Sequence, residues 1–387
     1  MNREAASTAT PLTRIRSLVV ISDRIDRRDA PVGDGGSHTP PWATTGAPPA
    51  EVAGSYLERL PLACIAAGLI DQAEIWHHQH GGERAPFDAR DGRLGYRAFR
   101  LDDTAPPFDN RDMVEFVRTY GVPHVLVVYG LGVSTDLLDA CANSIIIYNS
   151  IDAPALRVPS AVSARVDLVL TGARWQSAAV EARHPGMATA IMPVGPEFAA
   201  VDQFRPLGTP KDYDLIYVAA AQGYKRHDLL LEAFERLPRD VRGLCLFGYG
   251  EEADTIRARI AERGLSIDCV GPPGVPIDEV NRLMNRARFG VVCGRDDGAP
   301  AILTEYMLAG LPVLANAELT CGTHYILPTT GMLAAPEDFA AAIMTMRATA
   351  ASFDPRADVL ARWTWPHTIA RLRPVMQAIR AKKSEQY

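Results

Sequence analysis

The sequence predicts an α/β protein made of two doubly wound domains, each with a mainly parallel sheet. Short continuous apolar runs, typical of buried parallel strands, alternate with helical segments along most of the chain. This alternation breaks at 196–212, where the chain is punctuated by Pro and aperiodic, and then resumes. A length of 387 residues suits two to three domains at roughly 150 residues each.

The composition excludes several classes of protein. With 47% hydrophobic and 22% charged residues, the chain is neither disordered nor fibrous. A net charge of −6 provides no global basic field for nucleic acid. No apolar run approaches roughly 18 residues, and the first residues lack the apolar core of a secretory signal, so we expect a cytoplasmic protein. The excess of Arg over Lys and the abundance of Ala suggest a bacterial, GC-rich genome.

The N-terminal domain is predicted at 15–200, after a disordered tail at 1–14. Its first strand is expected at 16–22, followed by a Gly- and Pro-rich loop at 30–49 that is long enough to have a function. A helix is expected at about 50–69. Five further strand-like runs are AEIWHH, HVLVVYG, SIIIYNS, DLVLTG and TAIMPVG.

The C-terminal domain is predicted at 201–365, where strands and helices alternate again. The expected strands are 214–220, 243–247, 267–270, 288–293 and 312–315, and the expected helices are 226–237, 251–263, 277–286 and 300–309. A last helix, interrupted by Pro374, is predicted within 366–387. Doubly wound domains bind ligands at the carboxyl ends of their strands, so we expect the site where the two domains face one another.

The most informative segment is CGRDDGAPAILTEYMLAGLPVLAN at 293–316. A strand is expected to end at Cys293, and Pro300 opens a helix whose free amides and dipole favour an anion. The acids Asp297 and Glu305 flank this turn. Because carboxylates repel phosphate, we expect them to hold hydroxyl groups instead. A phosphate together with several sugar hydroxyls describes a nucleotide sugar.

These residues resemble the family-4 retaining glycosyltransferases of the GT-B fold. The matching segments are DGAP at 297–300 with Glu305 and AGLPV, QGYKRHDLLLEAF at 222–234, LFGYGEE at 246–252, LTCGTHYIL and GMLAAPED within 319–338, and the terminal RWTWPHTIARL. The likeness is close over about 190–375 and holds in outline before that. It implies two facing Rossmann-like domains and a C-terminal helix that crosses back onto the first domain.

The resemblance also implies roles for individual residues. Asp297, where the family usually has Glu, contacts hydroxyls of the donor hexose, and Glu305 holds the ribose. The implied donor-binding set is Lys225, Asp297, Gly298, Ala299, Pro300, Ala301, Ile302, Glu305 and Gly248.

Lys225 is the expected cation for the donor diphosphate, although a solvated charge at a helix start is the alternative. It is one of only four lysines, and it follows the carboxyl end of a predicted strand. The family pairs this Lys with an Arg five residues earlier, where this chain has Ala220. Arg295, at the end of a neighbouring strand, is expected to substitute and is preferred to Arg226. Lys225, Asp297 and Arg295 are therefore the catalytic candidates.

The mechanism follows from charge. Cleavage of the anomeric C–O bond builds negative charge on a nucleoside diphosphate, which cations placed in advance stabilise. The resemblance implies transfer of a hexose-type sugar to an acceptor hydroxyl with retention. Neither a metal nor another cofactor is expected, because these cations do the work of a divalent ion. The acceptor is expected to be a glycan, a lipid-linked molecule or a small molecule.

The acceptor side lies in the N-terminal half. Gly35 and Gly36 resemble the glycine loop of the family, whose backbone approaches the donor phosphates and the acceptor; a merely flexible loop is the alternative. Tyr129 and Asn149 stand at two strand ends where the family often has His.

Two other functions remain open. Gly248-Tyr249-Gly250, with Asp268 twenty residues after Gly248, matches a dinucleotide fingerprint, although it follows the second strand of its domain. An NAD-dependent enzyme is therefore one alternative. The departures at Ala220, Tyr129 and Asp297 leave open the other, a catalytically inactive nucleotide-sugar-binding homologue that partners another transferase.

Some patterns favour ordinary structural roles. The triplet Asp212–Asp214 resembles a metal-binding DxD but precedes a strand, and His77–His80 has no Cys or carboxylate beside it, so no metal site is expected. The six cysteines form no CxxC pair. Seven basic residues between Arg356 and Lys383 indicate either a solvated helix or contact with an anionic membrane that carries a lipid-linked acceptor.

Overall fold

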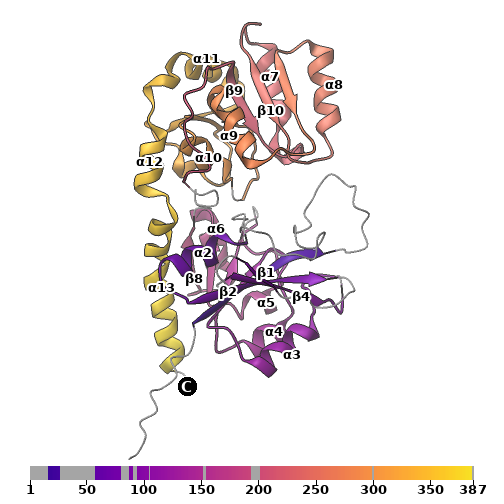
Figure 1. The fold of residues 1–387 in the computed structure, drawn as a ribbon, viewed down its shortest axis with the longest axis vertical. Helices are drawn as coiled ribbons and strands as arrows, with labels where there is room; N and C mark the ends of the chain where they lie inside the picture. Colours follow the sequence, from indigo (N-terminus) through magenta and orange to yellow (C-terminus); the bar gives the residue numbers. More distant parts are fainter. Residues whose placement is uncertain are drawn as a thin grey trace, which may run out of the picture.

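In a computed structural model, the chain forms two α/β domains, one above the other in Figure 1. The structure describes residues 16–26, 57–79, 87–89, 94–103, 105–150, 154–192, 201–298 and 300–385. Each domain has one sheet with helices on both faces, and the last two helices run along one side of the molecule (Figure 1). The predicted fold class, with two Rossmann-like halves and a helix crossing back, is confirmed.

The first sheet has the strand order β3-β4-β2-β1-β5-β6-β7-β8 and is parallel except for β3, which pairs antiparallel with β4. Its strands are β1 (Ser17–Asp26), β2 (Gln72–Gln79), β3 (Phe87–Ala89), β4 (Leu94–Arg100), β5 (Val125–Tyr129), β6 (Ile145–Asn149), β7 (Leu168–Thr171) and β8 (Ala188–Ile191). The helices between them are α2 (Arg59–Ala66), α3 (Arg111–Tyr120), α4 (Thr135–Ala140), α5 (Ser160–Ser163) and α6 (Arg174–Arg183).

Strand β1 explains why the first apolar run is continuous. Leu18 and Val20 pack into one apolar layer, which includes residues of α2, while Val19 and Ile21 pack into the opposite layer, which includes residues of α3 and α4. Neighbouring side chains of a strand point to opposite faces, and both faces are covered here, so every position in the run is apolar.

The second sheet has the order β11-β10-β9-β12-β13-β14 and is entirely parallel. Its strands are β9 (Tyr213–Val218), β10 (Gly243–Leu246), β11 (Ile267–Val270), β12 (Ala287–Val292), β13 (Val313–Asn316) and β14 (Gly331–Ala334). The main helices are α7 (His227–Glu235), α8 (Ala253–Arg263), α9 (Ile277–Asn285), α10 (Ile302–Leu308), α11 (Phe339–Thr349) and α12 (Pro355–Arg362). The chain order reverses direction at β9 and β12, the position where doubly wound domains bind ligands.

Helix α13 (Trp365–Glu385) attaches the end of the chain to the first domain. Trp365, Ile369 and Leu372 are buried in the same apolar layer as Leu18. The predicted interruption at Pro374 is wrong, since the helix runs through this residue. A proline inside a helix costs about 3 kcal/mol, and burial of the apolar face on both sides of it offsets that cost.

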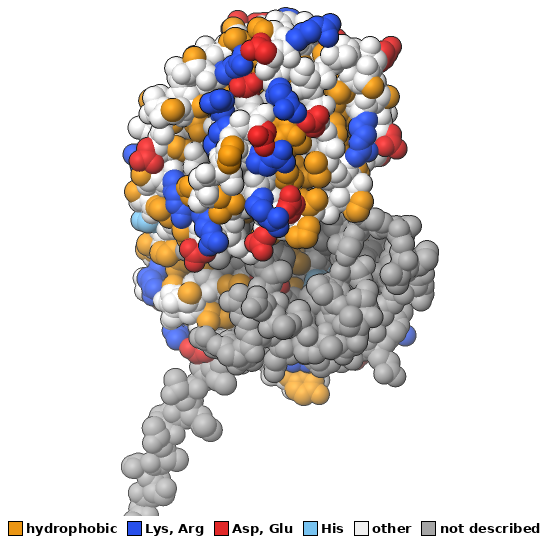
Figure 2. All heavy atoms as spheres, turned by 45° about the horizontal axis from the view of Figure 1, so that its top comes forward, with side chains coloured by type: hydrophobic (Ala, Val, Ile, Leu, Met, Phe, Trp, Pro, Cys, Tyr) orange, Lys and Arg blue, Asp and Glu red, His pale blue; other side chains and the backbone are white. Residues whose placement is uncertain are grey.

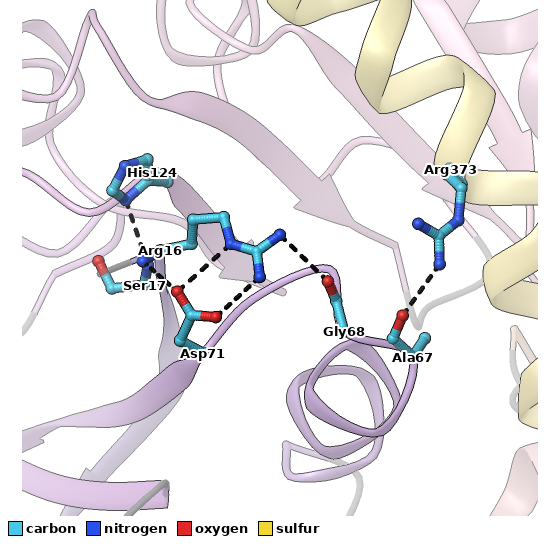
Figure 3. A network of polar contacts seen from close by, with 7 residues as sticks. All are labelled: Arg16, Ser17, Ala67, Gly68, Asp71, His124 and Arg373. Atoms are coloured by element: carbon cyan, nitrogen blue, oxygen red, sulfur yellow. Dashed lines mark hydrogen bonds and ion pairs between the residues drawn. The ribbon is translucent and has the colours of Figure 1, made fainter. Parts of the chain in front are cut away.

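Figure 3 shows how this helix meets the edge of the first sheet at which β1 begins. Arg373 donates to the carbonyl oxygen of Ala67 at 3.0 Å, just after α2. In the same region Arg16 pairs with Asp71 at 2.8 Å and donates to the carbonyl oxygen of Gly68 at 3.1 Å. The Arg16–Asp71 pair is exposed, so it fixes the entry into β1 while adding at most about 1 kcal/mol.

Several expected elements have different bounds, and the strands β3, β4 and β14 were not expected. The run LGYRAFR of β4 includes Gly95 and two Arg residues, so it lacks the apolar continuity that marked the other strands. The helix predicted at about 50–69 is described only as α2, because 51–56 lie outside the described residues. The tail at 1–14 and the whole loop at 30–49 also lie outside them.

The surface carries interspersed charges. On the face in Figure 2, Lys and Arg side chains stand beside Asp and Glu over the C-terminal domain. Several C-terminal cations have intramolecular partners: Lys383 contacts Asp167 at 2.7 Å, Arg362 contacts Asp358 at 2.8 Å and Arg356 donates to the carbonyl oxygen of Phe204 at 2.9 Å. These contacts favour a structural role for the basic segment. Within the described residues, no helix has the length and apolar character needed to span a membrane.

Candidate functional site

Lys225 lies at the carboxyl end of β9, in the turn Gly223–Lys225 that precedes α7. The hydroxyl of Tyr217, on β9, donates to the carbonyl oxygen of Lys225 at 2.5 Å and holds the turn against the sheet. The next residue, Arg226, has a φ of 53° and is the only described non-glycine residue with positive φ. The chain therefore bends sharply at Lys225, which keeps the side chain beside the strand ends rather than along α7.

Asp297 comes from the loop after β12 and forms an ion pair with Lys225. The side chains are only 16% (Lys225) and 10% (Asp297) exposed, so this is a largely desolvated pair. Burial by itself lowers the pKa of Lys225, but Asp297, Tyr224 and Tyr249 together outweigh burial and raise it. The sequence expectation that these two residues meet at neighbouring strand ends is thus met in space.

Two exposed tyrosines flank this pair. The Lys225 Nζ atom lies 4.8 Å from the centroid of the Tyr224 ring, a cation–π distance. Tyr249 follows β10 and interacts electrostatically with both Lys225 and Tyr224. Their side chains are 40% and 42% exposed, whereas most of the aromatic side chains that the structure describes are buried or half-buried. The pair therefore has an aromatic border open to solvent.

Glu305 lies in α10, and it faces a cation from the other domain. Arg59, the first residue of α2, is buried, and it interacts electrostatically with Glu305 and with Tyr129. Burial raises the pKa of Glu305, and the charge of Arg59 opposes that shift. Arg59 was not among the residues expected at the site. A signal was present, because Arg59 lies beside the apolar run LPLACIAAGL of the predicted helix.

Arg295 does not turn toward the Lys225–Asp297 pair. Its guanidinium is 3.9 Å from a carboxylate oxygen of Glu318, and its side chain is 58% exposed. Its backbone is tied to the site instead, since its N–H donates to the carbonyl oxygen of Tyr224 at 3.3 Å. Arg226 pairs with Asp228 at 3.1 Å. Neither guanidinium takes the place of the Arg that Ala220 replaces.

The turn before α10 differs from the expectation. The helix starts at Ile302 rather than at Pro300 and is seven residues long. The N–H groups of Leu303 and Glu305 already donate to the carbonyl oxygens of Pro300 and Ala301, both at 3.1 Å. Fewer free amides therefore face a ligand than predicted. Ala299 lies outside the described residues.

Two glycines near the strand ends have close backbone neighbours. A Cβ atom on Gly250, whose φ is +124°, would lie 2.3 Å from the carbonyl oxygen of Ala221. The second glycine of the Gly248–Gly250 turn is therefore required by packing against the Lys225 loop. Gly248 itself has open space around its Cβ position.

On the acceptor side, Tyr129 and Asn149 end neighbouring strands and lie in register with each other. Tyr129 is buried, and Asn149 is half-buried. They therefore share the carboxyl edge of the first sheet. Gly35 and Gly36 lie outside the described residues, so the predicted glycine loop stays a prediction.

The two domains touch at one end of the site. A Cβ atom on Gly172, just after β7, would lie 2.6 Å from the carbonyl oxygen of Gly298. The indole N–H of Trp175 donates to the carbonyl oxygen of Thr320 at 2.8 Å. These contacts join the loop after β7 to the loops after β12 and β13.

The geometry speaks against a dinucleotide site. Asp268 accepts from the hydroxyl of Tyr213 at 2.8 Å and pairs with Arg242 at 3.1 Å. It lies early in β11, so it cannot meet the Gly248 turn at the opposite end of the strands.

The metal-like patterns are also accounted for. Asp212 pairs with Arg286 at 2.7 Å, and the buried Asp214 pairs with Arg347 at 3.0 Å. His78 is buried in β2, where burial lowers its pKa to about 3. The described residues contain no group of three or more His, Cys, Asp and Glu placed to hold a metal.

The C-terminal half of the chain also matches the model of a known protein family. The model of the family described as Glycosyl transferases group 1 matches residues 201–348. No curated protein sequence matches the chain.

Solved structures match more than nine-tenths of the chain. Sucrose-phosphate synthase from Thermosynechococcus elongatus is similar with a TM-score of 0.64 at 17% identity, covering 95% of this chain and 100% of that one. The pneumococcal O-GlcNAc transferase GtfA, in complex with UDP and GlcNAc, is similar with a TM-score of 0.63 at 10% identity. The match covers 95% of this chain and 99% of GtfA. An E. coli structure described as trehalose-6-phosphate bound with UDP-2-fluoro glucose is similar with a TM-score of 0.64 at 13% identity. The match covers 93% of this chain and 99% of that one. Residues 201–348 therefore carry a glycosyl transferase group 1 region, and the chain as a whole has the GT-B fold.

Proposed function

We propose that this glycosyltransferase moves a hexose-type sugar from a nucleotide sugar to an acceptor hydroxyl, with retention of configuration at the anomeric carbon. The observation that carries the proposal is the Lys225–Asp297 ion pair at the ends of β9 and β12, with Glu305 in the following helix. An ammonium suits a diphosphate, and carboxylates suit sugar hydroxyls. Three groups from separate parts of the chain thus match the three parts of one donor molecule.

In this proposal Lys225 stabilises the leaving group. Negative charge grows on the diphosphate as the anomeric C–O bond breaks, and a cation in a partly desolvated site stabilises that charge more than it stabilises the ground state. The Tyr217 hydroxyl holds the backbone of Lys225 in place, so only the ammonium has to leave Asp297 when the diphosphate binds. The departing phosphate oxygen accepts the proton of the acceptor hydroxyl, and the new bond forms on the face that the phosphate leaves. No divalent cation takes part, because Lys225 supplies the positive charge.

Arg59 is the residue of the N-terminal domain that takes part in the proposed donor site. It places a second buried cation beside Glu305, across the domain boundary. We propose that Glu305 holds the ribose and that Arg59 keeps this carboxylate ionised and oriented. Tyr129 lies close to the same pair and borders the acceptor side. The acceptor is proposed to be a glycan, a lipid-linked molecule or a small molecule, and the protein is proposed to act in the cytoplasm.

The test is donor hydrolysis without acceptor. UDP-, GDP-, dTDP- and ADP-sugars would be incubated with the protein, and release of nucleoside diphosphate would be measured. UDP-glucose comes first, because two of the similar structures hold UDP or a UDP-sugar. Slow release with one base is expected. Lys225→Ala should chiefly lower turnover, and Glu305→Ala should chiefly weaken donor affinity. Full activity of either variant would remove that residue from the site.

One observation favours a second candidate, an inactive nucleotide-sugar-binding homologue that partners another transferase. Ala220 leaves one cation out, and Asp297 neutralises Lys225, so the described C-terminal wall has little net positive charge for a leaving group. Binding of a nucleotide sugar without hydrolysis or transfer to any acceptor would establish this candidate instead.

A further inference from the structure

A cavity of about 470 Å³ lies between the two domains, beside the loop that follows β13. Its walls come from three places: the start of α6 and the end of β8 in the first domain, the loop after β13 in the second, and the segment that joins α12 to α13. The Gly172–Gly298 contact lies between this cavity and the Lys225–Asp297 pair in the order of the strands. The cavity adjoins the loop that carries Asp297, since the Thr320 N–H donates to the carbonyl oxygen of Arg295 at 2.9 Å, but neither Lys225 nor Asp297 lines it.

The cavity has a positive rim. Arg174 and Arg371 both line it, and no described carboxylate lies within the bonding distance of a salt bridge to either guanidinium. Arg371 instead lies over the ring of Trp363, at 5.1 Å from the ring centroid. Other arginines in the same domains do have acids, such as Arg165 with Asp139 at 2.5 Å. None of the described residues that line the cavity is acidic.

The walls between the two cations are aromatic and carry hydrogen-bonding groups. Trp363 and the 43%-exposed Trp175 present indole surface. His324 lies 5.4 Å from Trp363 between ring centroids, and its buried Nε2 has no hydrogen-bond partner among the described residues. Burial, aided by the charge of Arg371, lowers the pKa of His324 to about 4, so the ring is neutral near pH 7. The Thr320 hydroxyl in the same wall donates to the carbonyl oxygen of Arg295 at 3.0 Å, which leaves its oxygen as an acceptor.

We propose that this cavity binds a phosphorylated hexose, at a site distinct from that of the donor. Two guanidinium groups suit the dianionic phosphate, and arginine forks bind phosphate oxygens bidentately. Indole surface suits the apolar face of a sugar ring, while the neutral imidazole and the threonine hydroxyl suit ring hydroxyls. The volume falls within the range of small-molecule sites.

The position of the site gives the ligand a second effect. Because the walls come from both domains and from the α12–α13 junction, a bound ligand stabilises the domain arrangement in which these walls are together. Binding here and binding in the donor site are therefore linked whenever the donor alters that arrangement. The phosphate could come from a free sugar phosphate or from a phosphorylated unit of a longer glycan, and the chemistry of recognition is the same.

The experiment is calorimetric titration of the full chain with glucose 6-phosphate, in the presence and absence of saturating UDP. Inorganic phosphate and glucose are titrated separately. The variants are Arg174→Gln and Arg371→Gln, and Arg118→Gln on α3 is the matched control because it removes the same charge from an exposed helix position. Arg174 is exposed at the start of α6, so its variant is expected to fold, and thermal unfolding of each variant verifies this. Only binding is measured, so the outcome does not depend on transferase activity.

We expect about one equivalent of glucose 6-phosphate to bind whether UDP is present or not. Each of the two cavity variants should weaken it at least roughly tenfold, while Arg118→Gln leaves it unchanged. Absence of saturable binding, displacement by UDP, or full affinity in both cavity variants would overturn the proposal. Inorganic phosphate binding as tightly as glucose 6-phosphate would overturn the assignment of a sugar ring to the indole walls. A phosphorylated oligosaccharide that binds more tightly than glucose 6-phosphate would identify the glycan as the source.

Discussion

Asp297 holds Lys225 in a largely desolvated ion pair, and removal of its charge should free the ammonium for a diphosphate. In Asp297→Asn, Lys225 loses the partner that compensates its burial, so the free protein should be destabilised by about 3 kcal/mol. A bound nucleoside diphosphate restores a partner for Lys225 and recovers part of this energy. A charge-assisted contact is worth roughly 1.5–3 kcal/mol, so UDP affinity should rise about tenfold to a hundredfold. Hydrolysis of the matching nucleotide sugar should fall, because the sugar hydroxyls lose an acceptor.

The assay is calorimetric titration of UDP into wild type and variant, with donor hydrolysis measured alongside. Asp296→Asn is the matched control, because this neighbouring acid is exposed and removal of its charge alters the general field without freeing Lys225. Its UDP affinity should change by less than roughly threefold. Unchanged or weaker UDP binding in Asp297→Asn would refute the reasoning, and an equal gain in Asp296→Asn would show that only the net charge matters.

Three further perturbations probe the account. Arg59→Gln should weaken donor binding roughly tenfold, and Arg59→Lys should recover part of the affinity because a cation is retained beside Glu305. Calorimetric titration with the donor measures both affinities. Equal donor affinity in the two variants would contradict the proposed interaction of Arg59 with Glu305. His78 and His227 are buried with pKa values lowered to about 3 and about 4, so the unfolded chain takes up protons first as pH falls below about 6.5. Stability should then decrease by up to about 1.4 kcal/mol per pH unit for each ring, which denaturant unfolding at pH 7, 6 and 5 measures, and His78→Phe should lessen the slope. Gly250→Ala should cost roughly 3 kcal/mol, because its Cβ would meet the backbone of Ala221; an unchanged Tm would contradict this.

The sequence predicted best those site residues whose positions follow from the order of the strands in the sheet. Lys225 and Asp297 follow β9 and β12, which are neighbours in a parallel sheet, so their meeting could be predicted from the strand pattern alone. The fold class followed from the same pattern and from the resemblance of the C-terminal half.

Tertiary contacts decided the features that were missed. Arg59 acts across a domain boundary, and nothing local in its helix reveals the carboxylate that it faces. Arg295 stands at the expected strand end, yet its side chain turns to Glu318, a choice that a linear pattern does not encode. Pro374 stays helical because burial of Leu372 and its neighbours outweighs a local propensity.

The most direct test of the central claim is a crystal structure of the protein with a hydrolysis-resistant nucleotide sugar. The account predicts the β-phosphate within hydrogen-bonding distance of the Lys225 Nζ atom, the hexose against Asp297 and the ribose against Glu305. A donor bound elsewhere, or one whose diphosphate lies away from Lys225 while the Lys225–Asp297 pair stays closed, would contradict it.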